Sequence, residues 1–517
     1  MQKLIKIIID CSKGYEVYAV GGFVRDLFFK RILNDMDLAV NKDAKKFAKK
    51  IAKALNAKLV ILDDINKIYR IILKNNDVKN IDISLFDGKS IEEDLKNRDF
   101  TVNAIAFPLC HPELVSKSSL RPPSRNLIQT AGLRGKPAMT TTVQNGAFLA
   151  KTHFIIFADK KCLQDLKNKT INILSKNVFK KDSLRMLRAF RFASEFNFKI
   201  SAETLEQIKT DSDLINKSAA ERVKNEFFRI LASGESAKYL KIMDNCGLLT
   251  AMFPEVYKMK KAVKKYYYHP DGLFQHSFET MEAVENILNN LKKYFPDNYK
   301  ELEAHFSNAE NYSEYVTKGN LLKFAALFHD SAKPETAKKE GGKMRFFGHE
   351  EQGAGKIEEI AQSLKMSKKD AANAKFLIEN HMRPSTLTKN NIVTNKAALK
   401  FLRDIGDNTP DLLILSMADW HSYKKLKVFS PKELKMQENS VRGLISQYYE
   451  IKNAKPLPKL IDGNIIMKEF KLKPGPWLGD LLNYVIEAQQ EGKISDKQSA
   501  LKLLLSKLAS VKKKYKL

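Results

Sequence analysis

Two aspartates one residue apart follow a pair of glycines near the start of the chain. Residues 19–37 read AVGGFVRDLFFKRILNDMD, which places Gly21 and Gly22 ahead of Asp35 and Asp37. Positions i and i+2 of a β-strand face the same side, so a strand here presents both carboxylates to one space. Two carboxylates can share two Mg2+ ions, which activate an attacking hydroxyl and stabilise a leaving pyrophosphate. The spacing therefore predicts a site for nucleotidyl transfer from a nucleoside triphosphate.

The glycines and a nearby arginine fit the same chemistry. Because Gly21 and Gly22 lack Cβ atoms, backbone N–H groups can approach a triphosphate at the start of a helix expected over residues 24–30. Arg25 adds a fixed positive charge there. A D-x-D pair by itself is more often a turn or a helix cap than a catalytic site, so the interpretation depends on the neighbouring motifs.

With these neighbours, the chain resembles the class II tRNA nucleotidyltransferases and bacterial poly(A) polymerases, whose first motif is GG-x-V-R-D followed by D-x-D. The residues that match this motif are Gly21, Gly22, Val24, Arg25, Asp26, Asp35 and Asp37. Further on, IDISLFDG supplies Asp82 as a third candidate catalytic acid. NRDFTVNAIAF then supplies Arg98, Asp99 and Asn103, which the resemblance implies support the ribose and phosphates of the nucleotide.

The segment DSLRMLRAFRFA, residues 182–193, resembles the base-reading helix of the same family. The resemblance implies that Asp182 and Arg185 hydrogen-bond the Watson–Crick edge of the incoming base, with Arg188 as a further nucleotide-binding residue. A carboxylate accepts from the amino group of cytosine or adenine, and a guanidinium donates to a ring nitrogen or carbonyl. An ordinary amphipathic helix is the alternative interpretation. Lys181 stands where the family usually has an acidic residue.

A second constellation of potential metal ligands lies in the C-terminal half. In the order H, HD, H, H, D, its members are His276, His329, Asp330, His349, His381 and Asp419. Six such positions in a nearly all-helical pattern resemble the HD-superfamily phosphohydrolases, which implies one or two divalent metals that activate water against a phosphoester. Imidazole and carboxylate ligands suit Mn, Fe, Ni, Co or Zn, whereas Mg2+ prefers oxygen alone. Lys333 could hold a substrate phosphate. A metal site retained for structure is the alternative.

The pattern of elements predicts an α+β multidomain chain. The resemblance implies a mixed α/β nucleotidyltransferase head of the polymerase-β type, followed by a largely all-α neck, an HD domain and a tail. Alternating apolar segments predict strands, and a helical period predicts one helix among them. The strands are expected at residues 17–20, 37–40, 68–73 and 81–85, and the helix at residues 45–55.

Four domains are expected from these elements and the resemblance. They are the head at residues 1–175, the helical neck with its RNA-binding segment at 176–250, the HD domain at 251–425 and a basic helical tail, expected to bind tRNA, at 426–517. An irregular stretch at about residues 110–151, rich in Ser, Thr, Pro and Gly, predicts a loop insertion in the head.

Composition agrees with an RNA partner without selecting it. The 517 residues carry a formal net charge of +29, which suits a phosphate backbone, although a lysine-rich proteome would give a similar balance. No stretch approaches the roughly 20 apolar residues of a membrane span, so no membrane association is expected. Four scattered cysteines without C-x-x-C spacing suit a reducing, cytoplasmic environment.

The motifs and the resemblance together predict a template-independent enzyme that adds CMP and AMP from CTP and ATP to tRNA 3′ ends with Mg2+, and a second, phosphohydrolase site. A poly(A) polymerase, or an enzyme that adds only C or only A, would carry the same motifs. From another class, the chain could be an HD phosphohydrolase whose N-terminal half only binds RNA. Loss of Asp35, Asp37 or Arg25 would have favoured that interpretation, and all three are present.

Overall fold

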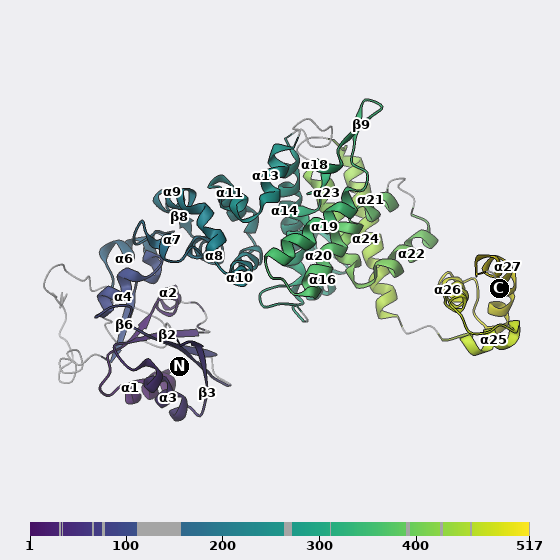
Figure 1. Cartoon of the computed structure of the whole chain (residues 1–517). Coiled ribbons are helices and arrows are strands. Elements are labelled where there is room, and N and C mark those ends of the chain that lie inside the picture. The colour runs from purple at the N-terminus through teal and green to yellow at the C-terminus, as the bar shows by residue number, and fades with distance from the viewer. Residues whose placement is uncertain are drawn as a thin grey trace. The chain divides into compact units, whose positions relative to one another are not determined.

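A computed structural model describes residues 1–29, 31, 33, 35–64, 67–74, 78–110, 157–262, 271–310, 312–388, 393–423, 428–454 and 458–515. The chain divides into two compact units, Met1–Phe253 and Pro254–Leu517 (Figure 1). The loop insertion expected at about residues 110–151 lies outside the described residues, apart from Cys110 at the end of a strand.

The first unit is built on a six-stranded mixed sheet with the order β3-β4-β5-β2-β1-β6. Its strands are β1 Val17–Val20, β2 Asp35–Val40, β3 Lys58–Asp63, β4 Ile68–Ile72, β5 Asn80–Leu85 and β6 Ala106–Cys110. The neighbours β2 and β5 run parallel, and their register sets Asp35 opposite Asn80 and Asp37 opposite Asp82. Alternation along β2 buries the apolar residues between and after the two aspartates, so both carboxylates lie on the opposite face.

Helices of the head pack around this sheet. They are α1 Gln2–Cys11, α2 Gly22–Phe28, α3 Ala44–Ala54, α4 Ile91–Asn97 and the 3-10 turn η1 Thr101–Asn103. The apolar residues of α3 recur at helical spacing, and Phe47 and Ile51 are fully buried where α3 meets the sheet. Ser90 caps α4 by accepting a hydrogen bond from the Glu93 backbone N–H.

A mostly helical part of the chain, from residue 160 of the head to the end of the neck, completes the first unit. Its elements are α6 Lys160–Lys167, β7 Thr170–Ile171, α7 Val178–Lys181, α8 Arg185–Phe196, β8 Lys199–Ile200, α9 Ala202–Asp211, η2 Ser212–Lys217, α10 Ala220–Leu231, α11 Ser236–Asn245 and α12 Leu248–Met252. Helices α8 and α10 pack against each other, and Phe190 and Phe227 are fully buried. The neck thereby holds α8 as a fixed wall beside the sheet.

Two predicted helices begin at other residues in the structure, and one strand was not predicted. The helix expected at residues 24–30 is α2, which starts earlier because Gly21, with φ of 61°, is its N-cap. The helix expected at residues 182–193 begins only at Arg185, because the Asp182 side chain accepts from the Leu184 backbone N–H and stabilises a turn instead. Strand β3 was not predicted, since its half-exposed edge position gives no alternating pattern.

The second unit is almost entirely helical among its described residues. Its larger part contains α13 Pro254–Lys261, α14 Leu273–Asn289, α15 Leu291–Tyr294, α16 Tyr299–Ser307, α17 Lys318–Phe328, α18 Lys333–Thr336, β9 Lys338–Glu340, β10 Lys343–Arg345, α19 His349–Ser363, α20 Lys368–Asn380, α21 Met382–Thr388, α22 Asn395–Ile405, η3 Gly406–Asn408, α23 Thr409–Ser422 and α24 Pro431–Asn453. Helices α14, α19, α20 and α23 surround α17, of which residues 319–328 are all buried. This bundle positions the HD residues.

Three further helices at the C-terminal end share a core of their own. They are α25 Gly463–Phe470, α26 Trp477–Gln490 and α27 Lys497–Tyr515. Trp477 is 2% exposed and packs inside this core. Within the described part of the chain, no helix is both long and apolar enough to cross a membrane. The predicted α+β multidomain architecture is confirmed.

Candidate active site and metal centre

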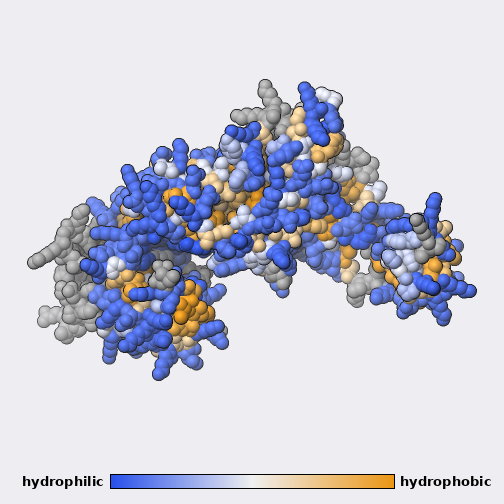
Figure 2. Space-filling view, in the orientation of Figure 1, coloured by the Kyte–Doolittle hydropathy of each residue, from blue (hydrophilic) through white to orange (hydrophobic). Residues whose placement is uncertain are grey.

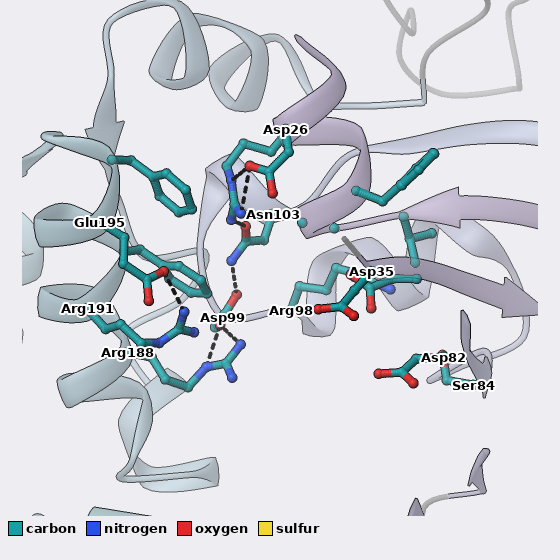
Figure 3. Close-up of a pocket in the computed structure, with 18 of the residues that line it drawn as sticks. Asp26, Asp35, Asp82, Ser84, Arg98, Asp99, Asn103, Arg188, Arg191 and Glu195 are labelled. Atoms are coloured by element: carbon teal, nitrogen blue, oxygen red, sulfur yellow. Dashed lines mark hydrogen bonds and ion pairs between the residues drawn. The ribbon is translucent and has the colours of Figure 1, made fainter. Parts of the chain in front are cut away.

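The residues predicted to form the nucleotidyltransferase site all line one cavity of about 930 Å³ in the first unit. They are Gly21, Gly22, Arg25, Asp26, Asp35, Asp37, Asp82, Arg98, Asp99, Asn103, Asp182, Arg185 and Arg188. Figure 3 shows Asp35 and Asp82 on one side of this cavity, Arg188 and Arg191 on the other, and Asp99 between them. A cavity of this size is in the range of small-molecule sites.

The three acidic residues of the sheet differ in their partners. Asp37 and Asp82 face each other across β2 and β5, while the Asp35 carboxylate accepts a hydrogen bond of 2.9 Å from Asn80. Arg70 on β4 binds Asp82 with two hydrogen bonds of 2.8 and 2.7 Å. Because a guanidinium occupies both oxygens of Asp82, the carboxylates best placed to hold cations are those of Asp35 and Asp37.

Asp37 lies at the centre of this acidic cluster. Burial, together with the nearby Asp82 carboxylate, raises the pKa of Asp37 to about 6. A Cβ atom at Gly22 would lie 3.4 Å from Asp37 Oδ2, and one at Gly21 would lie 2.8 Å from Arg98 Nη1. The glycine pair thus lets the backbone pass directly beside the carboxylate. Oxygen-only ligands and concentrated negative charge fit Mg2+.

Aromatic rings and arginines form the opposite wall. Arg25 is buried, lies 3.9 Å from the centre of the Phe196 ring and donates a hydrogen bond of 2.7 Å to Asn103. Arg191 lies 4.0 Å from the Phe192 ring and pairs with Glu226. Stacking and pairing hold these guanidinium groups in fixed positions, so the wall presents positive charge to an anionic ligand.

Asp99 connects the head to helix α8. One of its oxygens accepts from Arg188 at 3.0 and 2.7 Å, and the other accepts from Asn103 and from the Phe100 backbone N–H. Although burial alone would raise it, the Arg188 guanidinium and the Asn103 amide lower the pKa of Asp99 to about 2. Since both oxygens are engaged, Asp99 can act on a ligand only through Arg188 and Asn103, which it positions.

Replacement of Asp99 by asparagine should loosen α8. The depressed pKa means that the carboxylate stabilises the fold above its ordinary pKa near 4, and that this stabilisation is lost as the pH falls towards 2. At pH 7 we expect a loss of about 2 kcal/mol. Both tryptophans lie in the second unit, so their fluorescence does not report on α8, and hydrogen exchange of the α8 amides is the measurement. We expect about thirtyfold faster exchange in Asp99→Asn.

A matched control removes an exposed acid from the same unit. Asp64 is 63% exposed, and its partners are Lys45 at 3.4 Å and the Tyr69 hydroxyl at 3.1 Å, neither of them on α8, so Asp64→Asn should leave α8 exchange unchanged. Equal exchange in Asp99→Asn and wild type at pH 7 would contradict the positioning role. A difference that persists unchanged near pH 2 would show that the effect is not electrostatic.

The predicted base-reading residues sit at the start of α8. Asp182 accepts a hydrogen bond from Arg222 of α10 at 3.1 Å, and Arg185 donates one to the Asn97 backbone carbonyl at 3.3 Å. Lys181, which departs from the family pattern, donates to the Asn97 side chain. Asp182 and Arg185 both reach the cavity, so a base could contact both at once.

Several residues that line the cavity or support it were missed in the sequence. Those lining it are Arg31, Phe192, Glu195, Phe196 and Arg229, and Arg70 supports it from β4. The aromatic and acidic members lie three and four residues apart on α8, a spacing that indicates one helix face. Arg70 alternates with buried residues along a predicted strand, but only the register of β4 and β5 shows that it meets Asp82.

The six HD residues come together in the bundle of the second unit. They form two groups with potential ligand atoms within 4.8 Å of one another: His276, His329 and Asp419, and Asp330, His349 and His381. One oxygen of Asp330 lies 3.3 Å from Nε2 of both His276 and His329. Its other oxygen lies 3.5 Å from His349 and 3.7 Å from His381. Asp330 therefore bridges the two groups.

The orientation of the imidazoles fits metal binding. Nδ1 of His329, His349 and His381 each lies 2.6–2.8 Å from a backbone carbonyl three residues earlier. A ring that donates from Nδ1 leaves Nε2 as an acceptor, and all three Nε2 atoms face Asp330. Burial, assisted by His329, lowers the pKa of His381 to about 3, which keeps this ring neutral. The donor set matches a divalent transition metal.

Lys333 adds a cation at the edge of this cluster. Its ammonium lies 2.6 Å from Oδ2 of Asp330, the aspartate that bridges the two ligand groups. Although burial opposes it, the neighbouring His329 and Lys333 side chains hold the pKa of Asp330 well below its usual range. The carboxylate is therefore ionised and available as a ligand.

Family models match both units. The model described as the poly A polymerase head domain matches residues 17–116, and the HD domain model matches residues 273–424. Residues 197–259 match a model described as the "Probable RNA and SrmB- binding site of polymerase A". Residues 351–504 match a model of domain 2 of tRNA nucleotidyltransferases. The matches fall on the two groups of site residues and on the neck between them.

Relatives and solved structures agree with these models. The chain is 26% identical to a CC-adding tRNA nucleotidyltransferase of Thermus thermophilus over 95% of this chain and 93% of that protein. It is 25% identical to an A-adding tRNA nucleotidyltransferase of Deinococcus radiodurans over 93% of each. A CCA-adding enzyme in complex with ATP has a TM-score of 0.63 at 18% identity, covering 98% of this chain and 94% of that one.

Proposed function

Because the chain belongs to the family of class II tRNA nucleotidyltransferases and poly(A) polymerases, with an HD domain in its second unit, we propose that it adds CMP and AMP to the 3′ end of tRNA. The observation that supports this most directly is the cavity in which the acidic pair of β2 faces the arginine wall formed by α2 and α8. CTP and ATP are the proposed donors, and pyrophosphate is the product released.

In the proposed reaction, Asp35 and Asp37 hold Mg2+ beside the backbone of Gly21 and Gly22. The bound metal would supply the charge that activates the RNA hydroxyl and neutralises the triphosphate. Asp82, paired with Arg70, adds negative charge next to them without serving as the main ligand. The fixed guanidinium groups of the opposite wall bind the phosphates.

Base choice is proposed to rest on Asp182 and Arg185. Arg222 engages one Asp182 oxygen and the Leu184 N–H engages the other, so the carboxylate is held in one orientation. Such a carboxylate accepts from the amino groups of cytosine and adenine, whereas uracil offers a carbonyl there. Arg185→Ala should therefore weaken discrimination against UTP and GTP by about tenfold or more, since a buried recognition contact is worth about 1–3 kcal/mol.

The direct test is incorporation of labelled CTP and ATP, separately and together, onto tRNAs that end before CCA, after C and after CC. Product length is read at single-nucleotide resolution. Products that stop at CCA support the proposal. A long run of A means a poly(A) polymerase, and no incorporation contradicts the proposal.

Restricted addition is the alternative with a specific observation behind it. One CC-adding relative, of Thermus thermophilus, and one A-adding relative, of Deinococcus radiodurans, each match more than nine-tenths of this chain. A second CC-adding relative matches 46% of it, and the CCA-adding enzyme of Streptococcus pyogenes serotype M5 matches 47%. The incorporation assay separates the cases. A CC-adding enzyme extends the tRNA that ends before CCA by two C and stops, and an A-adding enzyme extends only the tRNA that ends in CC.

We also propose that the HD cluster hydrolyses a phosphoester. The complete set of six ligands, of which three imidazoles are oriented by backbone carbonyls, supports this function more than a structural metal site, which would not require Lys333 at its edge. Mn, Fe, Ni, Co or Zn are the metals that suit these ligands. In this proposal, residues 1–175 and 176–250 form the head and neck, residues 251–425 the HD domain, and residues 426–517 a tRNA-binding tail.

A further inference from the structure

A short β-hairpin lies in the chain between Asp330 and His349, two members of the HD cluster. Strand β9 begins two residues after α18, which starts at Lys333, and Gly348 leads from β10 directly into His349. Gly341 and Gly342 form the turn with φ of 56° and 77°, as a tight two-residue hairpin requires. The chain therefore ties this hairpin to a potential phosphate-binding lysine at one end and to a metal ligand at the other.

Basic side chains dominate the hairpin. Lys338, Lys339, Lys343 and Arg345 are all exposed, against one acidic residue, Glu340. A two-stranded ribbon that buries almost nothing gains little stability from its own side chains, so packing does not explain this composition. Figure 1 shows the hairpin at β9 standing away from the helices, and Figure 2 shows the same projection as mainly hydrophilic.

One aromatic ring interrupts this basic surface. Phe347 is 72% exposed, the largest value for a large hydrophobic side chain in the described part of the protein. Its neighbour Phe346 is half-buried, with the Lys333 ammonium 5.5 Å from the ring centre. Two residues span at most about 7 Å, so Phe347 lies close to His349. A single exposed ring among cations is the composition of a surface on which a base of single-stranded nucleic acid stacks.

We propose that the β9–β10 hairpin binds the end of a single RNA strand and presents its terminal phosphate to the HD cluster. Phe347 stacks on the terminal base, the exposed lysines and Arg345 bind the preceding phosphates, and Lys333 binds the terminal phosphate. RNA is the polymer because the first unit is proposed to act on RNA 3′ ends. This inference rests on the proposed phosphohydrolase function: water attacks phosphorus, the bond to a ribose oxygen breaks, and that oxygen takes the proton.

Photo-crosslinking tests the contact without requiring hydrolysis. The probe is a short single-stranded RNA with a 3′ phosphate and a terminal 5-iodouridine, irradiated with the full-length protein in EDTA. We expect crosslinked peptides that contain Phe347, and about tenfold less crosslinking there in Lys338→Ala with Lys339→Ala. The slope of log affinity against log salt should also fall by about 0.7 for each RNA phosphate that no longer pairs with a lysine. Crosslinks that all map outside residues 338–348 would overturn the proposal.

The matched control removes two lysines from the same unit. Lys368 and Lys369 are exposed at the start of α20, whose 13 residues place them about 18 Å from the His381 end. Lys368→Ala with Lys369→Ala should leave crosslinking at the hairpin unchanged. An equal loss in both double variants would show that net charge alone, and not the hairpin, accounts for binding.

Kinetics with Mn2+ separate the hairpin from the HD chemistry. Phe347→Ala should raise KM for the 3′-phosphorylated RNA about tenfold and leave kcat/KM for bis(p-nitrophenyl) phosphate unchanged, because the small ester does not reach the hairpin. An unchanged KM for RNA would contradict the proposal. If the wild type crosslinks through the hairpin but hydrolyses neither ester, the phosphohydrolase function fails while RNA binding by the hairpin stands.

Discussion

A chain with alanine at both Asp35 and Asp37 is expected to lose nucleotide addition by about a thousandfold or more. Both carboxylates lie on one face of β2, and both line the cavity that contains the arginine wall. A catalytic cation supplies several kcal/mol of charge stabilisation, and about 4 kcal/mol corresponds to a thousandfold in rate. Removing both ligands removes that contribution. The loss should appear in kcat, since the guanidinium groups that bind phosphates remain.

Mg2+ dependence provides the control for this prediction. Burial beside Asp82 raises the pKa of Asp37 to about 6, so protons compete with the cation below that pH. Wild-type addition at limiting Mg2+ should therefore rise through about pH 6, and saturating Mg2+ should shift this rise to lower pH. Asp64→Ala with Glu92→Ala removes two acids of the same unit from outside the cavity and should preserve activity. Full activity in the Asp35 and Asp37 double variant would exclude the proposed metal site.

The individual motifs of the nucleotidyltransferase site could be predicted because each depends on residues close together in the sequence. Carboxylates at Asp35 and Asp37 depend only on strand alternation, and the glycine pair depends only on the turn before α2. Strand order and domain packing then had to bring four separate motifs into one cavity. The sequence does not show how the domains pack. The prediction that these motifs form one site therefore depended on the family resemblance alone.

Pairings between strands and helices were the part that sequence could not supply. Arg70 meets Asp82 only because β4 and β5 align in one register, and a shift of one residue would turn Arg70 to the other face. The oxygens of Asp99 accept hydrogen bonds from Arg188 of α8 and Asn103 of η1; the sequence identified all three residues but not their contacts with one another. A motif identifies which residues matter, whereas long-range contacts decide whether they touch the ligand or position another residue.

For the HD cluster too, the sequence identified the residues but not their contacts. The sequence showed the six ligand residues and their order along the chain. It did not show that Asp330 bridges the two groups. The sequence also did not show that Nδ1 of His329 and of His381 lies at hydrogen-bond distance from the backbone carbonyl three residues earlier. That geometry arises because both rings follow the last residue of a helix, where the carbonyls of the final turn can accept from a side chain as well as from the backbone. Helix ends are the least predictable feature of a sequence, so the orientation required the structure.

Because Asp330 bridges the two groups, its removal should have a larger effect than removal of any one histidine. In Asp330→Ala, both groups lose a carboxylate, and the full-length protein should bind less than about a tenth of the transition metal that the wild type binds. His381→Ala removes a ligand from one group only and should retain metal in the other. Metal per chain, measured by mass spectrometry after desalting, distinguishes these outcomes.

Phosphoester hydrolysis should fall with the metal, by about a hundredfold or more in Asp330→Ala, while nucleotide addition is preserved. Asp330→Asn keeps the shape of the side chain, so the same loss of hydrolysis in this variant would show that misfolding is not its cause. His305→Ala is the matched control, because His305 is also buried against an aspartate, Asp411, but is not a member of the cluster. Loss of metal and hydrolysis in His305→Ala as well would mean that bundle stability, rather than ligand identity, governs the site. Retained metal in Asp330→Ala would show that the two groups bind independently, which the shared carboxylate geometry argues against.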